Sequence, residues 1–285
     1  MIINLCPTGM VPTRAMSPQV PLTNAEIARE VDACVPLGVN MVHLHVRDEE
    51  GRPHYGKDRY ADLIGRIRER HPDLVLCVSC SGRNFGEFEK RSEVLGLDGA
   101  LRPDMASLTL SSMNFARQAS VNAPDLVRRL AETMAERGIR PELEVFDLGM
   151  LNMANYLIAK GVLRPPHYVN LILGNLATAQ ASPAHLAALL AEMPPDAIWC
   201  VGGIGGAQLR ACAMGVLHGH GVRIGLEDNL YADPERTELA TNPGLVRRIV
   251  ELGRLLGQTP ASPSEVRERL GIAPVGPAPA AAPAP

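Results

Sequence analysis

Residues 41–48 of this chain read MVHLHVRD, an apolar run that carries two histidines, His43 and His45, two positions apart. Successive side chains of a β-strand point to opposite faces, so a strand here places both imidazoles on one face. Their Cα atoms would lie roughly 6.5–7 Å apart, which is close enough for the rings to share one metal ion. The segment therefore predicts a buried strand that ends in part of a metal site.

The strand-like pattern recurs along the chain, and each copy is followed by a segment with helical spacing of apolar residues. The expected strands cover residues 2–6, 40–46, 74–80, 105–110, 143–147, 168–173, 198–201 and 222–227. The expected helices cover residues 24–37, 58–70, 87–95, 124–137, 150–160, 183–192, 208–218 and 245–256. Eight strand–helix units predict an α/β fold, a TIM (β/α)8 barrel, as a single domain over residues 1–272. A doubly wound open sheet is the alternative, but it usually has fewer units and a glycine fingerprint in its first loop.

Composition describes an ordinary globular protein. The chain has 285 residues, of which 46% are hydrophobic and 21% charged, and a net charge of −3 argues against a dedicated nucleic-acid or membrane-surface binder. The N-terminus lacks the pattern of a signal peptide, no apolar run is long enough to span a bilayer, and the six cysteines are scattered. These features predict reduced thiols and a cytoplasmic location. Residues 273–285 are almost only Pro, Ala, Gly and Val, and we expect a flexible tail.

Acidic and basic residues gather where the last expected strand ends. Alternation places Arg223 and Glu227 on one face, and Asp228 follows on the turn. Barrel enzymes carry their chemistry at the carboxyl ends of the strands, so Glu227 can reach across the barrel mouth to His43 and His45. Two histidines and one glutamate are the ligand set of a catalytic zinc site. The alternative for either histidine alone is an ordinary hydrogen-bonded side chain in the barrel.

Other expected strands carry polar residues as well. Ser79 and Gly82 stand at the end of the third strand, Ser107 lies in the fourth, and Glu142 and Glu144 repeat at one parity around the fifth. Acids inside a barrel must be paired, metal-bound or catalytic, because burial of an uncompensated charge is costly. The two glutamates are therefore either part of the site or members of buried ion pairs with arginines.

Four strings carry a resemblance to a known family. They are HLHVRD from residue 43, PDMASL from residue 103, PELEVFD from residue 141 and GLEDN from residue 225. In order and spacing they resemble the β-keto acid cleavage enzymes, over roughly residues 1–260. The resemblance implies a zinc-dependent TIM-barrel acyltransferase, usually homotetrameric. Such enzymes condense a β-keto acid with acetyl-CoA and release acetoacetate and a new acyl-CoA.

The resemblance also implies roles for individual residues. The implied zinc ligands are His43, His45 and Glu227. The implied contacts of the keto acid are Ser79, Gly82 and Ser107, and the implied catalytic residues are Arg223, Asp228 and one of Glu142 or Glu144, of which we choose Glu144. Zinc would polarise the keto oxygen, and Asp228, oriented by Arg223, would remove the alcohol proton that triggers C–C cleavage.

The segment after the first strand departs from the family pattern. The type member, which acts on 3-keto-5-aminohexanoate, carries Thr-Gly and then, two residues on, a glutamate that pairs with the ammonium group of the substrate. Here Thr8 and Gly9 are followed by Val11, so a cationic substrate would lose its counter-charge. We therefore predict against 3-keto-5-aminohexanoate and for an apolar or neutral side chain. Arg14 could instead select a second carboxylate, unless it is an ordinary exposed arginine.

Two other interpretations compete with this one. Another zinc-dependent TIM-barrel enzyme, a class II-type aldolase or an amidohydrolase, would also use histidines and acids at strand ends. Amidohydrolases place their His-x-His pair on the first strand, whereas the pair here is expected on the second. A metal-binding scaffold without activity conflicts with the convergence of polar residues at five strand ends, because such residues cost stability unless they serve a site.

Overall fold

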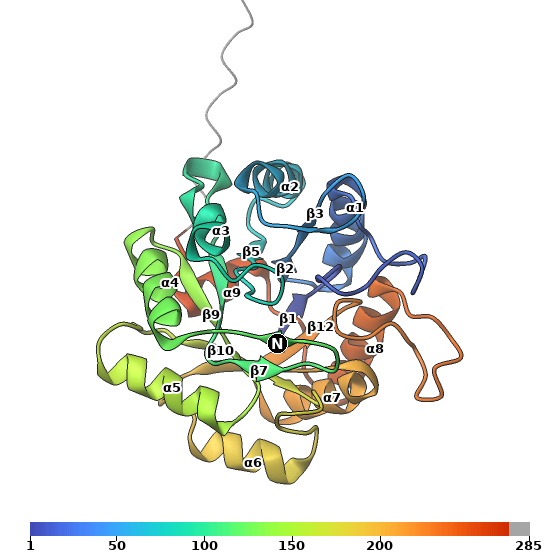
Figure 1. Cartoon of the computed structure of the whole chain (residues 1–285). Coiled ribbons are helices and arrows are strands. Elements are labelled where there is room, and N and C mark those ends of the chain that lie inside the picture. Colours follow the sequence, from blue (N-terminus) through green and yellow to red (C-terminus); the bar gives the residue numbers. More distant parts are fainter. Residues whose placement is uncertain (274–285) are drawn as a thin grey trace, which may run out of the picture.

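Eight parallel strands close into a barrel in the computed structural model, which describes residues 1–273 (Figure 1). In chain order they are β1 (Ile2–Leu5), β2 (Met41–Leu44), β5 (Val75–Val78), β6 (Met105–Thr109), β9 (Arg140–Val145), β10 (Tyr168–Leu173), β11 (Ile198–Gly203) and β12 (Gly221–Ile224). The first strand closes the barrel because β1 pairs with both β2 and β12. The prediction of a TIM barrel is confirmed. All but the first residue of the predicted tail lies outside the described residues.

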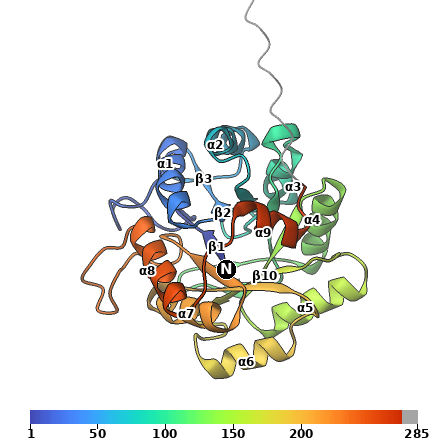
Figure 2. The ribbon, with the colours of Figure 1, turned by 180° about the vertical axis from the view of Figure 1, so that it is seen from behind.

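Helices follow the strands and surround the barrel (Figures 1 and 2). They are α1 (Asn24–Cys34), α2 (Lys57–Arg70), α3 (Phe88–Ser92), α4 (Pro124–Glu136), α5 (Leu148–Ala159), α6 (Pro183–Ala191), α7 (Gln208–His218) and α8 (Asn242–Leu255). The Thr23 hydroxyl accepts from the Glu26 amide and the Glu26 side chain accepts from the Thr23 amide, so the two residues form a capping box at the start of α1. Buried apolar faces of these helices pack against the outer faces of the strands in one core cluster.

The last barrel strand ends three residues earlier than the sequence predicts. The last strand was expected to reach residue 227, but β12 ends at Ile224, because Gly225 has a φ of 150° and brings its backbone against that of Cys6. A Cβ at position 225 would lie 2.1 Å from the Cys6 carbonyl oxygen, so only glycine fits. Glu227 therefore lies in the turn after the strand, where its amide donates to that same carbonyl at 3.1 Å.

Two short antiparallel hairpins extend the loops on the carboxyl side of the barrel. One joins β3 (Val46–Arg47) to β4 (Pro53–His54), so His45 lies between the end of β2 and this hairpin. The other joins β7 (Met113–Asn114) to β8 (Ala119–Ser120) and crosses in front of the barrel opening in Figure 1. Their strands of two residues are too short to give a periodic signal in the sequence.

A ninth helix, α9 (Pro263–Leu270), was not predicted, although Ser262 and Glu265 form a second capping box at its start. Its Val266 and Leu270 pack with a cluster that includes the first residues of five barrel strands: Ile2, Met41, Val75, Met105 and Tyr168. The helix thus covers the amino-terminal end of the barrel (Figure 2). Eight residues with two buried apolar positions carry too little periodicity to be recognised.

Among residues 1–273, none of the helices has both the length and the apolar content that a membrane crossing requires. All six cysteines are buried and unpaired, as expected for reduced thiols.

A buried ion network joins α9 to the barrel. The Asp104 carboxylate accepts from Arg267 at 2.7 and 3.0 Å, from Arg68 at 3.1 Å and from the Leu76 amide at 2.9 Å. Replacing Asp104 by Asn leaves two buried guanidinium groups without their counter-charge. We predict that D104N lowers the free energy of unfolding by about 3–5 kcal/mol in urea titrations.

The matched control is R66M, which removes an exposed pair of Arg66 and Asp62 at 2.9 Å. This variant should change stability by less than about 1 kcal/mol. A D104N variant as stable as R66M would show that the network does not hold α9 in place.

Candidate active site

Three side chains converge inside the barrel at its carboxyl end. The Nε2 atoms of His43 and His45 lie 3.2 Å apart, and His45 Nε2 lies 3.2 Å from Glu227 Oε1. Two nitrogens bound to one tetrahedral zinc at 2.0–2.1 Å would lie about 3.3 Å apart, which agrees with the observed spacing. Glu227 Oε2 is buried and meets no hydrogen-bond donor among the described residues. Two ring nitrogens and a carboxylate group that face one another at this spacing fit a metal ion.

The loop after β1 leaves room for the Glu227 side chain at Gly9. Gly9 has a φ of 66°, and a Cβ there would lie 2.4 Å from the Glu227 Cγ atom. Any other residue at position 9 would displace the carboxylate from the two histidines. This explains the glycine of the Thr8–Gly9 pair in physical terms.

Glu142 supports this metal set from behind. Its Oε2 accepts from His43 Nδ1 at 2.6 Å, and its Oε1 accepts from the amide groups of Asn4 at 2.7 Å and Asn170 at 2.6 Å. Burial disfavours the charged form, but the ring of His43 and the guanidinium of Arg223 outweigh it and lower the pKa of Glu142 to about 2. A carboxylate on Nδ1 keeps the proton there and leaves the Nε2 lone pair free for a metal. From the sequence we choose Glu144 over Glu142 as the catalytic acid, and the contacts give the two glutamates different roles.

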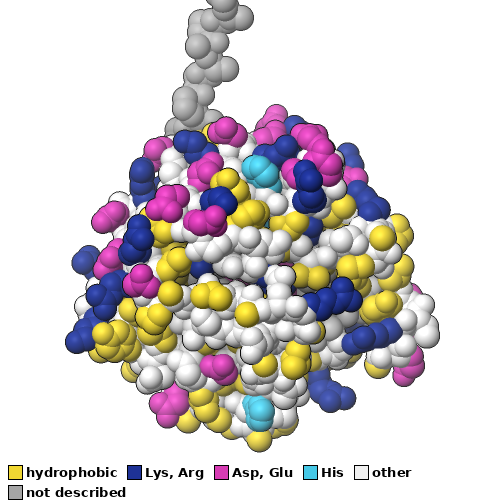
Figure 3. Space-filling view, viewed as in Figure 1, with side chains coloured by type: hydrophobic (Ala, Val, Ile, Leu, Met, Phe, Trp, Pro, Cys, Tyr) yellow, Lys and Arg dark blue, Asp and Glu magenta, His cyan; other side chains and the backbone are white. Residues whose placement is uncertain are grey.

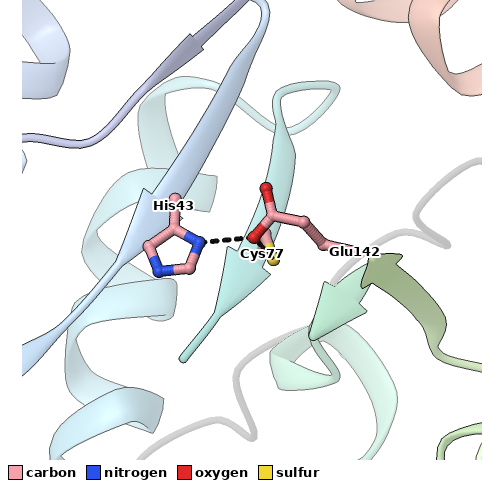
Figure 4. Close-up of side chains that lie close together, drawn as sticks. All are labelled: His43, Cys77 and Glu142. Carbon is pink, nitrogen blue, oxygen red and sulfur yellow. Dashed lines mark hydrogen bonds and ion pairs between the residues drawn. The ribbon is translucent and has the colours of Figure 1, made fainter. Parts of the chain in front are cut away.

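A second set could also hold a metal: His43, Cys77 and Glu142 (Figure 4). The Cys77 thiol lies 3.2 Å from Glu142 Oε2, and burial raises the pKa of the thiol well above its usual value. Both oxygens of Glu142 already accept hydrogen bonds. This set is therefore better explained as a hydrogen-bonded support for His43 than as a second metal site.

One buried guanidinium joins the acids at the centre of the site. Arg223 donates from Nε to Asp228 at 3.0 Å and from Nη2 to Glu227 at 2.8 Å, and its Nη1 lies 3.5 Å from Glu144. Glu144 also accepts from the Thr109 hydroxyl at 2.6 Å. Burial raises the pKa values of Glu144 and Asp228 in spite of Arg223. The predicted metal ligand and the predicted catalytic pair thus form one contiguous cluster.

A cavity of ≈ 850 Å³ opens above this cluster. Its floor includes His43, His45, Glu144, Arg223 and Asp228, and its walls carry apolar side chains: Met113, Phe115, Phe146, Ile172 and Leu230. Figure 3 shows the same face, where uncharged side chains surround the centre and most charged ones lie toward the edge. A cavity of this size can take a small acid and the reactive end of a larger co-substrate.

The predicted substrate residues divide into two groups. Ser79 and Val11 line the cavity, whereas Gly82 and Ser107 are not among the described residues that do. The Ser107 hydroxyl accepts from the Cys80 amide at 3.1 Å, and a Cβ at position 82 would lie 2.6 Å from Arg91 Nη1. Gly82 and Ser107 thus shape the loop that carries Ser79.

Arg14 lies outside the cavity lining. Its Nη2 atom donates to both carboxylate oxygens of Glu26, at 2.8 Å to each. The interpretation of Arg14 as an ordinary surface arginine is therefore the one that its contacts support.

Comparison with known proteins agrees with this geometry. The family model described as beta-keto acid cleavage enzyme matches residues 1–272. The chain belongs to the beta-keto acid cleavage enzyme family. The resemblance found in the four sequence strings is therefore confirmed.

Relatives in this family match over nearly the whole chain. The 3-keto-5-aminohexanoate cleavage enzyme of Acetoanaerobium sticklandii is 33% identical, over 95% of this chain and 98% of its own. The 3-oxoadipate:acetyl-CoA acetyltransferase of Cupriavidus necator is 34% identical, over 95% of this chain and 94% of its own. Among solved structures, the apo form of ObcA matches 90% of this chain and 66% of its own, with a TM-score of 0.79 at 21% identity, which supports the barrel fold alone.

The two possible metal sets can be separated by metal analysis. We predict one zinc per chain after dialysis against zinc, and a loss of that zinc in E227Q but not in C77S, because Cys77 belongs only to the alternative set. E142Q should bind zinc about 10–100-fold more weakly, because His43 loses its orienting carboxylate. Mass-spectrometric metal content and competition with a chelator measure both effects. Zinc lost from C77S and retained by E227Q would place the ion on the other set.

Proposed function

We propose that this chain is a zinc-dependent acyltransferase that exchanges the acyl group of a β-keto acid. A β-keto acid R–CO–CH2–COO⁻ and acetyl-CoA give acetoacetate and R–CO–S-CoA. The observation that supports this most strongly is the cluster of His43, His45 and Glu227 beside the pair of Arg223 and Asp228, all at the floor of one open cavity. A zinc ion held by the first three residues would polarise the keto oxygen of the substrate.

The reaction needs a base at the carbon between the keto group and the carboxylate. Loss of a proton there allows this carbon to bond to the acetyl carbon, and the CoA thiolate leaves. The thiolate then adds to the original keto carbon, and the bond between this carbon and the former CH2 carbon breaks. The former CH2 carbon regains a proton and becomes part of acetoacetate. One carboxylate can take and return this carbon-bound proton, a role that replaces the removal of an alcohol proton expected from the sequence. Asp228 is our candidate because it lines the cavity beside Glu227.

The contacts of Asp228 suit this role. Arg223 donates to Oδ2 only, and none of the described residues donates to Oδ1, which is left to accept a proton from substrate. Arg223 itself fixes the orientation of the carboxylate, and it supplies positive charge next to the reacting carbonyl groups. Glu144, which Thr109 and Arg223 hold in place, completes the polar floor.

The relatives support a shared reaction with variable side chains. Their names specify 3-oxoadipate, 3-dehydrocarnitine and 3,5-dioxohexanoate, each with acetyl-CoA. Variation of this kind supports our proposal that the common chemistry takes place on the floor of the cavity and that its walls select the substrate. We propose acetyl-CoA as the co-substrate here as well.

We predict that D228N lowers kcat for acetoacetate formation by about 10²–10⁴-fold, because the amide cannot accept the proton. Acetoacetate is measured in a mixture of acetyl-CoA and β-keto acids, with and without a chelator. D98N, at an exposed carboxylate that pairs with Arg137, is the control and should keep the wild-type rate. Acetoacetate formation by D228N at the wild-type rate would exclude Asp228 as the base.

Val11 bears on the charge of the substrate. It lines the cavity and is 49% exposed, in the loop where the relatives that act on an amino substrate would carry an acid. We predict that the wild type prefers uncharged β-keto acids to 5-amino-3-oxohexanoate. V11E should raise the preference for 5-amino-3-oxohexanoate about 10–100-fold, because the new carboxylate would bind the ammonium group of this substrate.

The control for this experiment is V11Q, which has the size of glutamate without the charge. Higher kcat/KM of the wild type on the amino substrate than on uncharged β-keto acids would contradict the prediction.

A further inference from the structure

Arg83 lines the cavity from the loop that follows β5, and contacts within this loop and from the β7–β8 hairpin hold it in place. Its amide donates to the Ser81 hydroxyl at 3.3 Å, and the Gln118 side chain donates to its carbonyl oxygen at 3.2 Å. The guanidinium carbon lies 3.3 Å from the centre of the Phe115 ring. The aromatic ring covers one face of the guanidinium and leaves the N–H groups at its edge directed sideways.

These N–H groups meet no counter-charge within the described part of the chain. No acidic side chain lies within 4.0 Å of the Arg83 guanidinium, and the side chain donates no hydrogen bond to another described residue. Arg91, eight positions further on, differs: it donates to the Cys80 carbonyl and to Asn122, both at 2.8 Å. Partial burial without a partner lowers the pKa of Arg83, and such a group gains most from binding an anion.

Among the residues that the structure describes, the acidic side chains that line the cavity are all paired, whereas most of the basic ones are not. Its three acids, Glu144, Glu227 and Asp228, all contact Arg223 on the floor. The other three cations of the lining, Arg83, Arg117 and Arg236, form no ion pair among residues 1–273. The walls therefore carry cations that no described acid contacts, although the floor acids Glu144, Glu227 and Asp228 still act on Arg83 through space.

The position of Arg83 decides which anion it meets. The carboxylate shared by all β-keto acids is two bonds from the keto carbon, so it stays on the floor with the reacting atoms. The phosphates of CoA are separated from the thioester by the long pantetheine arm and remain outside the mouth. The Arg83 head group lies on Phe115, next to the β7–β8 hairpin that crosses in front of the opening (Figure 1). Because Arg223 and not Arg83 holds the acids of the floor, we assign an anion at Arg83 to the far end of the substrate side chain.

We propose that Arg83 is a specificity residue that binds a second carboxylate at the distal end of the substrate, so that the preferred substrates are β-keto dicarboxylic acids. The planar edge of the guanidinium matches a carboxylate with two parallel hydrogen bonds. The apolar walls, Met113 and Phe146 among them, suit the methylene groups between the two ends. This proposal rests on the proposed function for the identity of the reacting end, and it replaces the expectation of an uncharged side chain.

The test compares R83M and R83K with wild type on a β-keto dicarboxylic acid and on its distal monomethyl ester. Wild type should prefer the free acid, and R83M should lower that preference about 10–100-fold, the loss expected for a charge-assisted contact. R83K keeps the charge but cannot form two parallel hydrogen bonds. Its preference for the free acid should therefore lie between those of wild type and R83M. R14M removes an arginine that Glu26 already binds and should leave the preference unchanged. Equal losses on both substrates, or a rise only in the KM for acetyl-CoA, would overturn the proposal.

A binding measurement separates this proposal from the proposed function, because it needs no turnover. Calorimetry with glutarate and with its monomethyl ester should show tighter binding of glutarate to wild type and loss of the difference in R83M, with thermal melts to confirm that the variants are folded. Binding that depends on Arg83, without acetoacetate from any β-keto acid, would refute the proposed function and support the anion site. Acetoacetate formation with the same glutarate binding in wild type and R83M would refute the anion site and leave the proposed function standing.

Discussion

A single buried cation organises the centre of this barrel. Arg223 is 2% exposed and contacts Asp228, Glu227 and Glu144, so it compensates acids that could not be buried without a counter-charge. It also aims them: its Nη2 fixes one oxygen of Glu227 beside His45, and its Nε fixes one oxygen of Asp228. Without this guanidinium, neither the metal ligand nor the proposed base would have a defined position.

The sequence predicts the barrel well because barrel strands and their helices have strong, different periodicities. It also predicts which side chains meet, since the strand ends of a barrel share one edge, and His43 and Glu227 do lie at that edge although 184 positions separate them. It fails where close contacts between distant segments decide the structure. The end of β12 depends on Gly225 against Cys6, and α9 depends on Val266 and Leu270 covering the strand starts.

The same limit applies inside the site. Alternation alone places Glu142 and Glu144 on one face, but only the three-dimensional contacts assign Glu142 to His43 and Glu144 to Thr109. Ser107 and Gly82 have the right positions along the chain for substrate contacts, yet their neighbours are Cys80 and Arg91. Arg83 carries no signal in the sequence, because its lack of a partner appears only in the folded chain. The floor of the site is thus predictable from residue types, whereas the walls are not.

The proposed chemistry depends most on a metal ion between His43, His45 and Glu227. Anomalous diffraction on either side of the zinc absorption edge, from crystals of the protein purified with zinc, tests it directly. The account predicts one anomalous peak per chain within about 2.0–2.2 Å of both Nε2 atoms and a carboxylate oxygen of Glu227. A peak bound instead by Cys77 and Glu142, or no peak between the two histidines at full zinc content, would contradict it.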